Sequence, residues 1–543
     1  MNENRGKGDS NLQYYYPQNV FKYISDKITQ KDIKILFTYF LCGVCVYMPM
    51  LTQWLTNPDG LLYSMIYRED HGWENSQGRF GLYYFDKLKN DYIFPVAETL
   101  YCILLLAVIA LLICKIFDCT NHVLICIAIG AFLILSPNTS NLLTYYYCSA
   151  AYTTSYLLAV IAAYLLTRRT DIKACLLSIV CISISLSLYQ AYIGVTITLC
   201  VFYLIVKVIF DDNWQSGFLK YLLRGGISGV GGILGYLIAF KGIQLIKGII
   251  PDAARGFDSM GSVRFSELPD LIGKAYLAFI QYFFTNDIIN NSWKRRGIVN
   301  LFCVAVLLTL IIIIIIRKRL YTDIKRIIVL VFSLMLIPLV MCCITVIAPE
   351  ASIYDETGML MLPQMNLFYM FMLVTAERIV LSQKGTFFLK WITGIVTLYL
   401  ISIFWIYTNI FQTCLKVNLD KAYNVATRMV MRMEMTEEHK TGMALFVYGR
   451  MERGNFENIN TSLFEVTKGS VARYGLFWEE NWNKQNCWTQ FLQQYLGVYY
   501  TPCEKERSQT IMAEKEFAEM PVFPDNGSVK VINGVMVVKL SEE

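Results

Sequence analysis

Apolar stretches of about 20 residues with almost no charge recur along most of this sequence. A helix of that length spans the hydrocarbon core of a bilayer and satisfies its own backbone hydrogen bonds there. Composition agrees, since 55% of the 543 residues are apolar and only 17% are charged, whereas soluble domains carry roughly a quarter charged residues. The sequence therefore predicts an all-α polytopic membrane protein.

The apolar stretches predict about 11 crossings. They lie at residues 33–55, 96–117, 122–135, 146–167, 174–188, 191–210, 221–246, 298–316, 327–347, 359–381 and 387–411. The first lies too deep for a cleaved signal peptide, so we expect it to remain as an anchor. Glycines crowd the start of 221–246, where small residues let neighbouring helices approach closely.

Basic side chains in the connectors fix the predicted orientation. They fall on the side of the N-terminal segment 1–32, at Arg168, Arg169, Lys173, the region 207–224, Arg317, Lys318, Arg319, Lys325, Arg326 and Lys384. By the positive-inside rule this side is the cytoplasm. An odd number of crossings then places the C-terminal segment outside, together with the acidic loops at 59–91, 252–287 and 350–356.

One basic cluster, Lys294-Arg295-Arg296, falls outside by this count. Either the apolar stretch 271–284 crosses after all, or the cluster has a role at the outer surface. We favour the second interpretation, because about 14 residues suit an interfacial or re-entrant helix better than a crossing. Arg295 and Arg296 are then candidates for binding an anionic lipid head group, and a simple topology anchor is the alternative.

Net charge and cysteine usage exclude other classes. The net charge of +6 does not predict nucleic-acid binding, because the basic residues sit in connectors. Most of the 16 cysteines lie inside apolar stretches, where they act as small apolar residues. With three histidines and no metal-ligand spacing, no metal site is predicted. Cys487 and Cys503 lie in the polar tail, where a disulfide is left open.

Residues 412–543 differ in composition from the membrane part and predict a small extracytoplasmic α+β domain. Residues 424–432 have the pattern of an amphipathic helix, and 444–447 that of a strand. Residues 529–538 alternate around Asn533-Gly534, which indicates a hairpin. We expect this domain to serve stability or acceptor recognition rather than catalysis.

The loop at 56–95 concentrates acidic and aromatic side chains in a chain that has few charges elsewhere. It contains Asp59, Glu69, Asp70, Trp73, Glu74, Arg79, Asp86 and Asp91. An ordinary polar connector is the alternative to a functional site. For sugar transfer at a membrane surface, Asp70 or Asp59 would take the acceptor proton. Arg79 would hold the leaving phosphate, and Trp73 with Tyr63 or Tyr67 would stack on the sugar.

Each of these side chains also has a structural interpretation. Glu69 and Asp70 suit a helix N-cap, Arg79 suits an ion pair, and Trp73 suits an interfacial anchor. Their concentration in one loop favours a site. A nucleotide sugar is a poor donor here, because it is confined to the cytoplasm and no phosphate-binding glycine loop is present. A polyprenyl phosphate can present a sugar on the outer side.

Two segments of the chain resemble a known family. They are Asn57-Pro58-Asp59-Gly60 through Glu69-Asp70, Trp73-Glu74, Gly78-Arg79-Phe80-Gly81 and Phe85-Asp86-Lys87-Leu88 to Pro95, and Ser187-Leu188-Tyr189-Gln190-Ala191-Tyr192. These motifs resemble the bacterial O-antigen glucosyltransferases, which are GT-C-type membrane enzymes similar to glucosyl transferase II. Phe80 stands where that family would have tryptophan, which bears on sugar fit more than on chemistry.

The resemblance implies transfer of glucose, or a related sugar, from a polyprenyl-phosphate donor to a cell-surface glycan at the bacterial cytoplasmic membrane. It implies Asp70 as the general base, beside Glu69, with Asp59 as second choice. Substrate and donor phosphate would be bound by Arg79, Trp73, Glu74, Tyr189, Gln190, Arg295 and Arg296. Some GT-C enzymes use a divalent metal, but nothing in these residues requires one.

A non-enzymatic flippase or transporter of lipid-linked glycans is the alternative from another class. Such a protein would carry charged residues deep within its spans, whereas this chain places its acids in outer loops. An O-antigen polymerase would have its large functional loop late in the chain.

Overall fold

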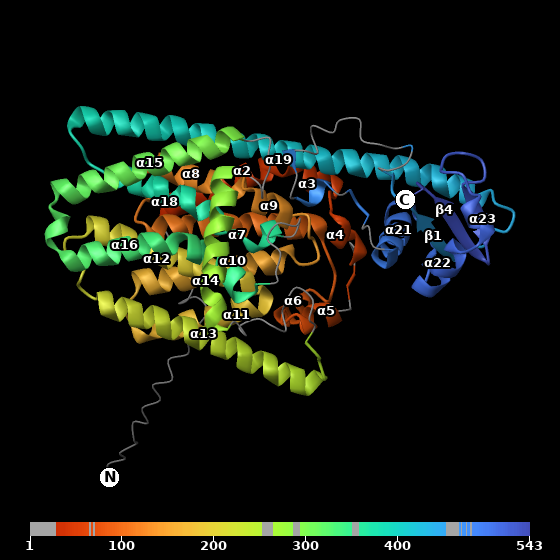
Figure 1. The fold of residues 1–543 in the computed structure, drawn as a ribbon, viewed down its shortest axis with the longest axis horizontal. Helices are drawn as coiled ribbons and strands as arrows, with labels where there is room; N and C mark the ends of the chain where they lie inside the picture. Colours follow the sequence, from red (N-terminus) through yellow and green to blue (C-terminus); the bar gives the residue numbers. More distant parts are fainter. Residues whose placement is uncertain are drawn as a thin grey trace, which may run out of the picture.

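The computed structural model describes residues 29–63, 67–68, 71–251, 264–285, 294–349, 358–451, 455, 466–467, 470–473, 475–477 and 481–542. Long helices lie side by side in one bundle, and a small sheet-containing unit lies at one end of it (Figure 1). The bundle helices are α2 (Gln30–Val46), α3 (Met48–Gln53), α7 (Pro95–Ile116), α8 (Val123–Ile134), α10 (Ser149–Arg168), α11 (Ile172–Leu188), α12 (Ile193–Phe210), α13 (Phe218–Lys247), α15 (Lys294–Arg317), α16 (Ile324–Met341), α18 (Met365–Arg378) and α19 (Gln383–Glu434).

Every predicted apolar range falls on one or two of these helices. Within the described residues, seven helices are long and apolar enough to cross a bilayer. The number is eight if α2 and the segment after it, bent by 56°, count as one span. The structure thus agrees with a polytopic membrane protein, and the number of 11 crossings stays a prediction.

The outer helices expose apolar side chains rather than polar ones. Only 17% of the apolar window of α13 and 28% of that of α15 are buried, compared with 67% for α7 and α12. Ile238 and Phe332 are among the large side chains exposed on this surface. Contiguous exposed apolar faces of this size mark contact with something other than water, which is lipid for helices of this length.

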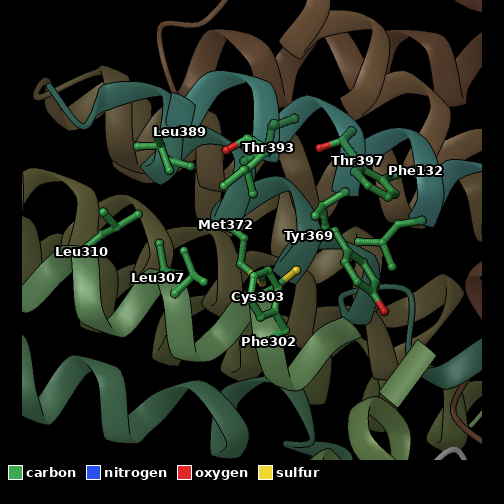
Figure 2. Close-up of a pocket in the computed structure, with 16 residues that line it drawn as sticks. Phe132, Phe302, Cys303, Leu307, Leu310, Tyr369, Met372, Leu389, Thr393 and Thr397 are labelled. Atoms are coloured by element: carbon green, nitrogen blue, oxygen red, sulfur yellow. The ribbon is translucent and has the colours of Figure 1, made fainter. Parts of the chain in front are cut away.

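Among the grooves in the described apolar surface, two lie between long helices. One lies between α15, α18 and α19, with Cys303, Met372 and Thr397 among its lining residues (Figure 2). The other lies between α12, α13 and α16 and is lined in part by Gly225, Gly226 and Gly229. The predicted glycine packing is therefore confirmed only for the second half of the stripe, where Gly231, Gly232 and Gly235 meet α11 at Ile179, Ile182 and Ser183.

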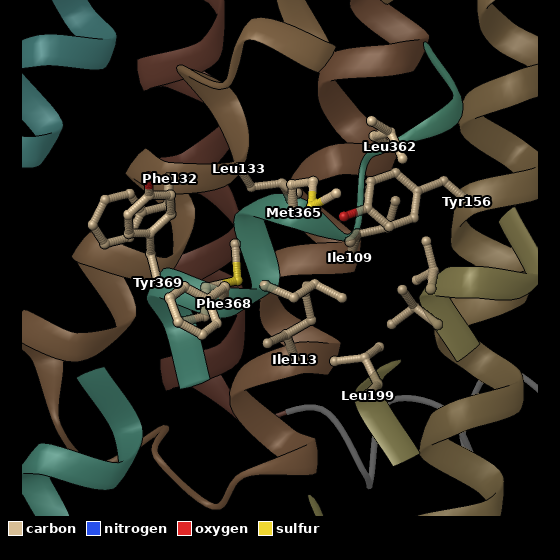
Figure 3. Close-up of a cluster of buried hydrophobic side chains, with 14 of the residues drawn as sticks. Ile109, Ile113, Phe132, Leu133, Tyr156, Leu199, Leu362, Met365, Phe368 and Tyr369 are labelled. Carbon is tan, nitrogen blue, oxygen red and sulfur yellow. The ribbon is translucent and has the colours of Figure 1, made fainter. Parts of the chain in front are cut away.

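The core of the bundle lies where α7, α8, α10, α12 and α18 meet. Ile109, Phe132, Leu199 and Met365 pack there in one buried cluster (Figure 3). Their contact joins helices that are far apart in the sequence. Packing between these helices, rather than the short connections between neighbours, therefore holds the bundle together.

The basic connectors gather at one end of the bundle, as predicted. The Lys115 ammonium is 2.9 Å from the Asp32 carboxylate beside the start of α2. At the same end Arg168 pairs with Asp118, and the Trp214 indole donates to Asp323 at 2.9 Å, joining the connectors 211–217 and 318–323. That this end faces the cytoplasm stays a prediction.

A short helix interrupts the pattern of parallel helices. The helix α14 (Leu268–Ile280) continues into a π-helical turn, η4 (Gln281–Thr285), and lies across the direction of the long helices (Figure 1). Since α13 begins and α15 ends at the basic end, α14 starts and finishes at the opposite end. It has the placement of an interfacial or re-entrant helix, and Arg296 lies at the end opposite the basic connectors.

The C-terminal part contains the predicted strand and hairpin. Strands β1 (Ala444–Tyr448), β2 (Thr501–Pro502), β3 (Val529–Ile532) and β4 (Val535–Lys539) form a sheet in the order β2-β1-β4-β3. Strands β3 and β4 pair antiparallel around Asn533 and Gly534, both at positive φ, as a tight hairpin requires. Helix α19 runs without a break through residue 412, where we predicted a domain boundary.

Helices cover both faces of this sheet. They are α21 (Asn481–Leu496) on one face and α22 (Lys505–Met512) with α23 (Lys515–Ala518) on the other. Cys487 packs in the first of these two cores and Cys503 in the second. Both are free buried thiols, so the disulfide left open by the sequence is not formed.

Candidate functional site

The loop at 56–95 folds into short helices at the same end of the bundle as the sheet unit. The first, α4 (Pro58–Leu62), is capped by Asn57, whose Oδ1 accepts a hydrogen bond from the Gly60 N–H at 2.7 Å. The Asn57 amide also donates to the Thr144 hydroxyl at 2.8 Å, which ties the loop to the segment before α10. Asp59 is therefore held, half-buried, in the first turn of α4.

The sheet unit packs directly against this part of the loop. Leu61 shares a buried core with residues of α19, β1 and α21. The Cys487 thiol donates to the Pro58 carbonyl at 3.5 Å, and the Tyr495 hydroxyl donates to the Trp54 carbonyl at 3.3 Å. The start of the first loop, at α4, thus lies between the bundle and the C-terminal unit (Figure 1).

The loop closes on itself near its two ends. The Arg68 N–H donates to the Asp91 carbonyl at 2.9 Å, and Tyr67 and Tyr92 form a β-bridge. Helices α5 (Gly72–Ser76) and α6 (Gly81–Lys87) lie between these ends. The described charged side chains between Arg68 and Asp91 are therefore positioned by a closed ring of chain.

Arg68 occupies the inside of the loop between two aromatic rings. Its guanidinium lies 4.6 Å from the centre of the Tyr63 ring and 4.6 Å from that of Tyr147. It forms an ion pair with Glu74, and both side chains are almost fully buried. Burial alone would lower the pKa of Arg68, but the charge of Glu74 and smaller contributions from Tyr147 and Asp86 together raise it, so the guanidinium stays charged.

Arg79 lies in a second aromatic enclosure. Its Nη1 donates to the Tyr152 hydroxyl at 3.0 Å, and its guanidinium lies 5.0 Å from the Tyr189 ring centre and 5.5 Å from that of Trp73. Its Nε is buried without a hydrogen-bond acceptor among the described residues. An anion that reached this position would find a charged, planar donor already oriented by aromatic faces.

The two arginines share one carboxylate. The charge of Glu74 acts on both Arg68 and Arg79 and raises the pKa of both guanidinium groups. Burial raises the pKa of Tyr63 and of Tyr147, and the nearby carboxylate of Asp59 adds to the effect. Asp59 therefore belongs to the same neighbourhood as the arginines.

A second polar cluster in the loop consists of His71, Asp86, Lys89 and Asp91. The His71 ring is 3.7 Å from the Asp86 carboxylate and 3.8 Å from that of Asp91. Lys89 is 3.3 Å from Asp86 and also pairs with Glu98 at the start of α7. Burial raises the pKa of Asp86, and Lys89 only partly offsets it. These acids are paired within the protein, so we assign them to supporting the loop.

Gln190 anchors the loop to the bundle. Its side-chain amide donates to the Gln77 carbonyl at 2.7 Å and to the Tyr236 hydroxyl at 3.1 Å, and that hydroxyl in turn donates to the Gly78 carbonyl at 3.2 Å. Gly78 has φ +71°, a backbone conformation that costs other residues roughly 1–2 kcal/mol. These bonds fix the backbone directly before Arg79.

Gly81 allows the loop to approach the end of α11, and its substitution is predicted to loosen the site. A Cβ at Gly81 would lie 2.9 Å from the Ser187 carbonyl. We expect Gly81→Ala to lower the free energy of unfolding by about 1–3 kcal/mol, as overpacking does, seen as a lower melting temperature of the purified protein. Gly226→Ala is the matched control, because a Cβ there meets nothing within 4 Å; equal melting temperatures for both variants would contradict the prediction.

The structure brings together several, but not all, of the predicted site residues. Asp59, Trp73, Glu74, Arg79 and Tyr189 surround one region. Gln190 lies beside it and bonds to the loop backbone. Arg296 is buried in a different part of the bundle. The side chains of Glu69, Asp70 and Arg295 lie outside the described residues.

Three residues of this region were not singled out from the sequence. Arg68 directly precedes Glu69-Asp70, which is the signal that would have pointed to it. Tyr147 lies in the segment before α10, and Tyr152 lies in the first turn of that helix. Nothing in their local sequence distinguishes them from other tyrosines. In the described part of the chain, no group of three His, Cys, Asp or Glu side chains is arranged to hold a metal ion.

An apolar helical bundle with a buried cluster of arginines and aromatic rings at one end has the architecture of a polytopic membrane protein. The model of the family described as Glucosyl transferase GtrII matches residues 62–375, more than half of the 543-residue chain. The chain belongs to this family, which confirms the resemblance found in its motifs and supports glycosyltransferase activity. No curated protein and no solved structure matches the chain.

Proposed function

We propose that this protein transfers glucose from a polyprenyl-phosphate donor to a hydroxyl of a cell-surface glycan. The transfer takes place at the outer face of a bacterial cytoplasmic membrane, with the basic end of the bundle in the cytoplasm. The protein is then a GT-C-type enzyme whose site is the loop at 56–95.

One observation carries this proposal: two charged guanidinium groups, Arg68 and Arg79, are held between aromatic rings at one end of an apolar bundle. A lipid-linked sugar phosphate has the complementary parts. Its phosphate needs a cation, its sugar ring packs well on aromatic faces, and its polyprenyl chain needs an apolar environment. The family match to a glucosyl transferase agrees with this ligand.

The proposed reaction uses these groups as follows. The acceptor hydroxyl attacks the anomeric carbon, and the bond from that carbon to the phosphate oxygen breaks. The phosphate leaves with the bonding electrons as polyprenyl phosphate, its charge stabilised by Arg79. The acceptor proton passes to a loop carboxylate, Asp70 or else Asp59, as general base. The C-terminal unit borders the loop at Leu61 and would guide the acceptor glycan.

Comparison of surface glycans from cells with and without this gene tests the proposal. We expect the glycan of the deletion strain to lack a side-branch glucose, which mass spectrometry and linkage analysis would detect, and a plasmid copy of the gene should restore it. Glycans of identical composition and linkage in both strains would refute the proposed function. Accumulation of an unmodified lipid-linked glycan on the inner face only would instead favour a flippase.

A further inference from the structure

Arg296, in the first turn of α15, is a buried cation without a carboxylate partner among the described residues. Its side chain is 2% exposed. Its Nε donates to the Tyr369 hydroxyl at 3.1 Å, and its guanidinium lies 5.1 Å from the Tyr282 ring centre and 5.8 Å from that of Phe404. The Nη2 atom is buried with no hydrogen-bond acceptor in the described part of the chain.

An unpaired buried charge is expensive, and an ion that neutralises it recovers much of that cost. Neighbouring groups provide a second donor. The Tyr369 hydroxyl oxygen accepts hydrogen bonds from both Arg296 and the Asn300 amide, the latter at 3.2 Å, so its own proton is directed elsewhere. No described residue accepts that proton. Arg296 Nη2 and the Tyr369 O–H thus form a pair of donors suited to one anionic oxygen group.

An apolar groove begins at the same tyrosine. Tyr369 lines the end of the groove between α15, α18 and α19, and the groove continues past Cys303, Leu307 and Thr393 to Leu389 (Figure 2). None of its lining residues is charged. Phe302 on its wall is 51% exposed and lies on the lipid-facing surface of α15. A ligand can therefore enter from the membrane with its charged end toward Tyr369, whose hydroxyl is bonded to Arg296.

We propose that this groove is a second lipid site, which holds the chain of a polyprenyl phosphate while Arg296 and Tyr369 bind its phosphate. This rests on the proposed function in one respect, namely that such a lipid is the carrier of the donor sugar. The groove lies between three helices and suits a single chain rather than the two acyl chains of a glycerophospholipid. It is separate from the first-loop site, because Arg79 and Arg296 have no contact residue in common. It gives the carrier a docking position outside the reacting site.

Two cysteines allow a test in the intact, unmodified protein. Cys303 lines the proposed groove, and Cys200 lines the other apolar groove, which no charged side chain lines; both thiols are partly exposed. The purified full-length protein in a non-ionic detergent would be treated with N-ethylmaleimide. The rate at which each cysteine is alkylated would then be measured by peptide mass spectrometry. The probe is geranylgeranyl phosphate, with geranylgeraniol and phosphatidylglycerol at the same concentration as comparisons.

We expect geranylgeranyl phosphate to slow alkylation of Cys303 several-fold and to leave Cys200 unchanged. Geranylgeraniol and phosphatidylglycerol should protect Cys303 much less. Arg296→Gln should raise the concentration needed for protection by roughly 10- to 100-fold, the usual effect of losing a charge-assisted hydrogen bond. Arg79→Gln should leave the protection of Cys303 intact, because that arginine belongs to the other site.

Equal protection of both cysteines, equal protection by the alcohol, or better protection by phosphatidylglycerol would overturn the proposal. So would a loss of protection in Arg79→Gln. If Arg296→Gln does not fold, the comparison of phosphate with alcohol in the wild-type protein still decides. These measurements require no sugar transfer, so a negative glycan comparison refutes the proposed function without affecting this result, and absent protection refutes this site alone.

Discussion

The Asp70→Asn variant is expected to lose sugar transfer by about 10²–10⁴-fold, the usual contribution of a general base. Asparagine has nearly the same shape as aspartate but cannot take the acceptor proton. Asp70 lies within the family match at 62–375, whereas Asp59 lies just before it. The measurement is the fraction of surface glycan that carries the side-branch sugar, in a deletion strain that expresses the variant at wild-type level.

Asp59→Asn is the parallel variant. Because Asp59 is half-buried in α4 near Tyr63 and Tyr147, its substitution should have a smaller effect if Asp70 is the base. A full loss in Asp59→Asn with normal modification in Asp70→Asn would exchange the two assignments. Full modification in both variants would exclude a loop aspartate as the base at either position.

The Arg79→Gln variant is expected to reduce transfer by about 10²–10³-fold, as removal of a donor that stabilises developing charge does. The guanidinium is already oriented by Tyr152, Tyr189 and Trp73, so glutamine loses both the charge and the planar fork. Arg79→Lys keeps the charge but not the fork or the stacking, and we expect it to fall between wild type and Arg79→Gln. Turnover would be measured with a synthetic polyprenyl-phosphate glucose in purified protein.

Arg317→Gln provides the matched control, because Arg317 is exposed at the opposite end of the bundle, where α15 ends. It removes the same charge and should leave turnover unchanged. The melting temperatures of the two variants would show whether loss of turnover reflects loss of fold. If Arg79→Gln turns over as fast as the control, Arg79 does not stabilise the leaving phosphate.

The helices of this protein were predictable because lipid imposes a strong and local requirement. Each crossing needs a long apolar run, and each predicted run coincides with helix in the structure. The hairpin at Asn533-Gly534 was predictable for a similar reason, since its turn demands positive φ at both residues. The domain boundary at 412 rests on a change of composition, and composition does not reveal that α19 continues through it.

In the first loop, the sequence allowed some site residues to be predicted but not the residues that contact them. Its concentration of charge and aromatic residues marked it, and Arg79, Trp73 and Glu74 could be selected by type. Their partners could not, because Tyr152 in α10 and Tyr189 directly after α11 lie about 70 and 110 residues later in the chain. Contacts of this length depend on how helices pack, which no local pattern encodes.

By itself, the sequence determined that the chain lies in a membrane, which connectors carry its positive charge, and which loop holds its acids, because these follow from the local match between side chains and solvent. Only the tertiary structure decided that Arg68 and Arg79 are enclosed by aromatic rings from the loop and from the α10 and α11 region, and that Arg296 contacts a different set of residues. The physical reason is that the groups packed around a buried charge decide what it can bind, and those groups come from distant parts of the chain.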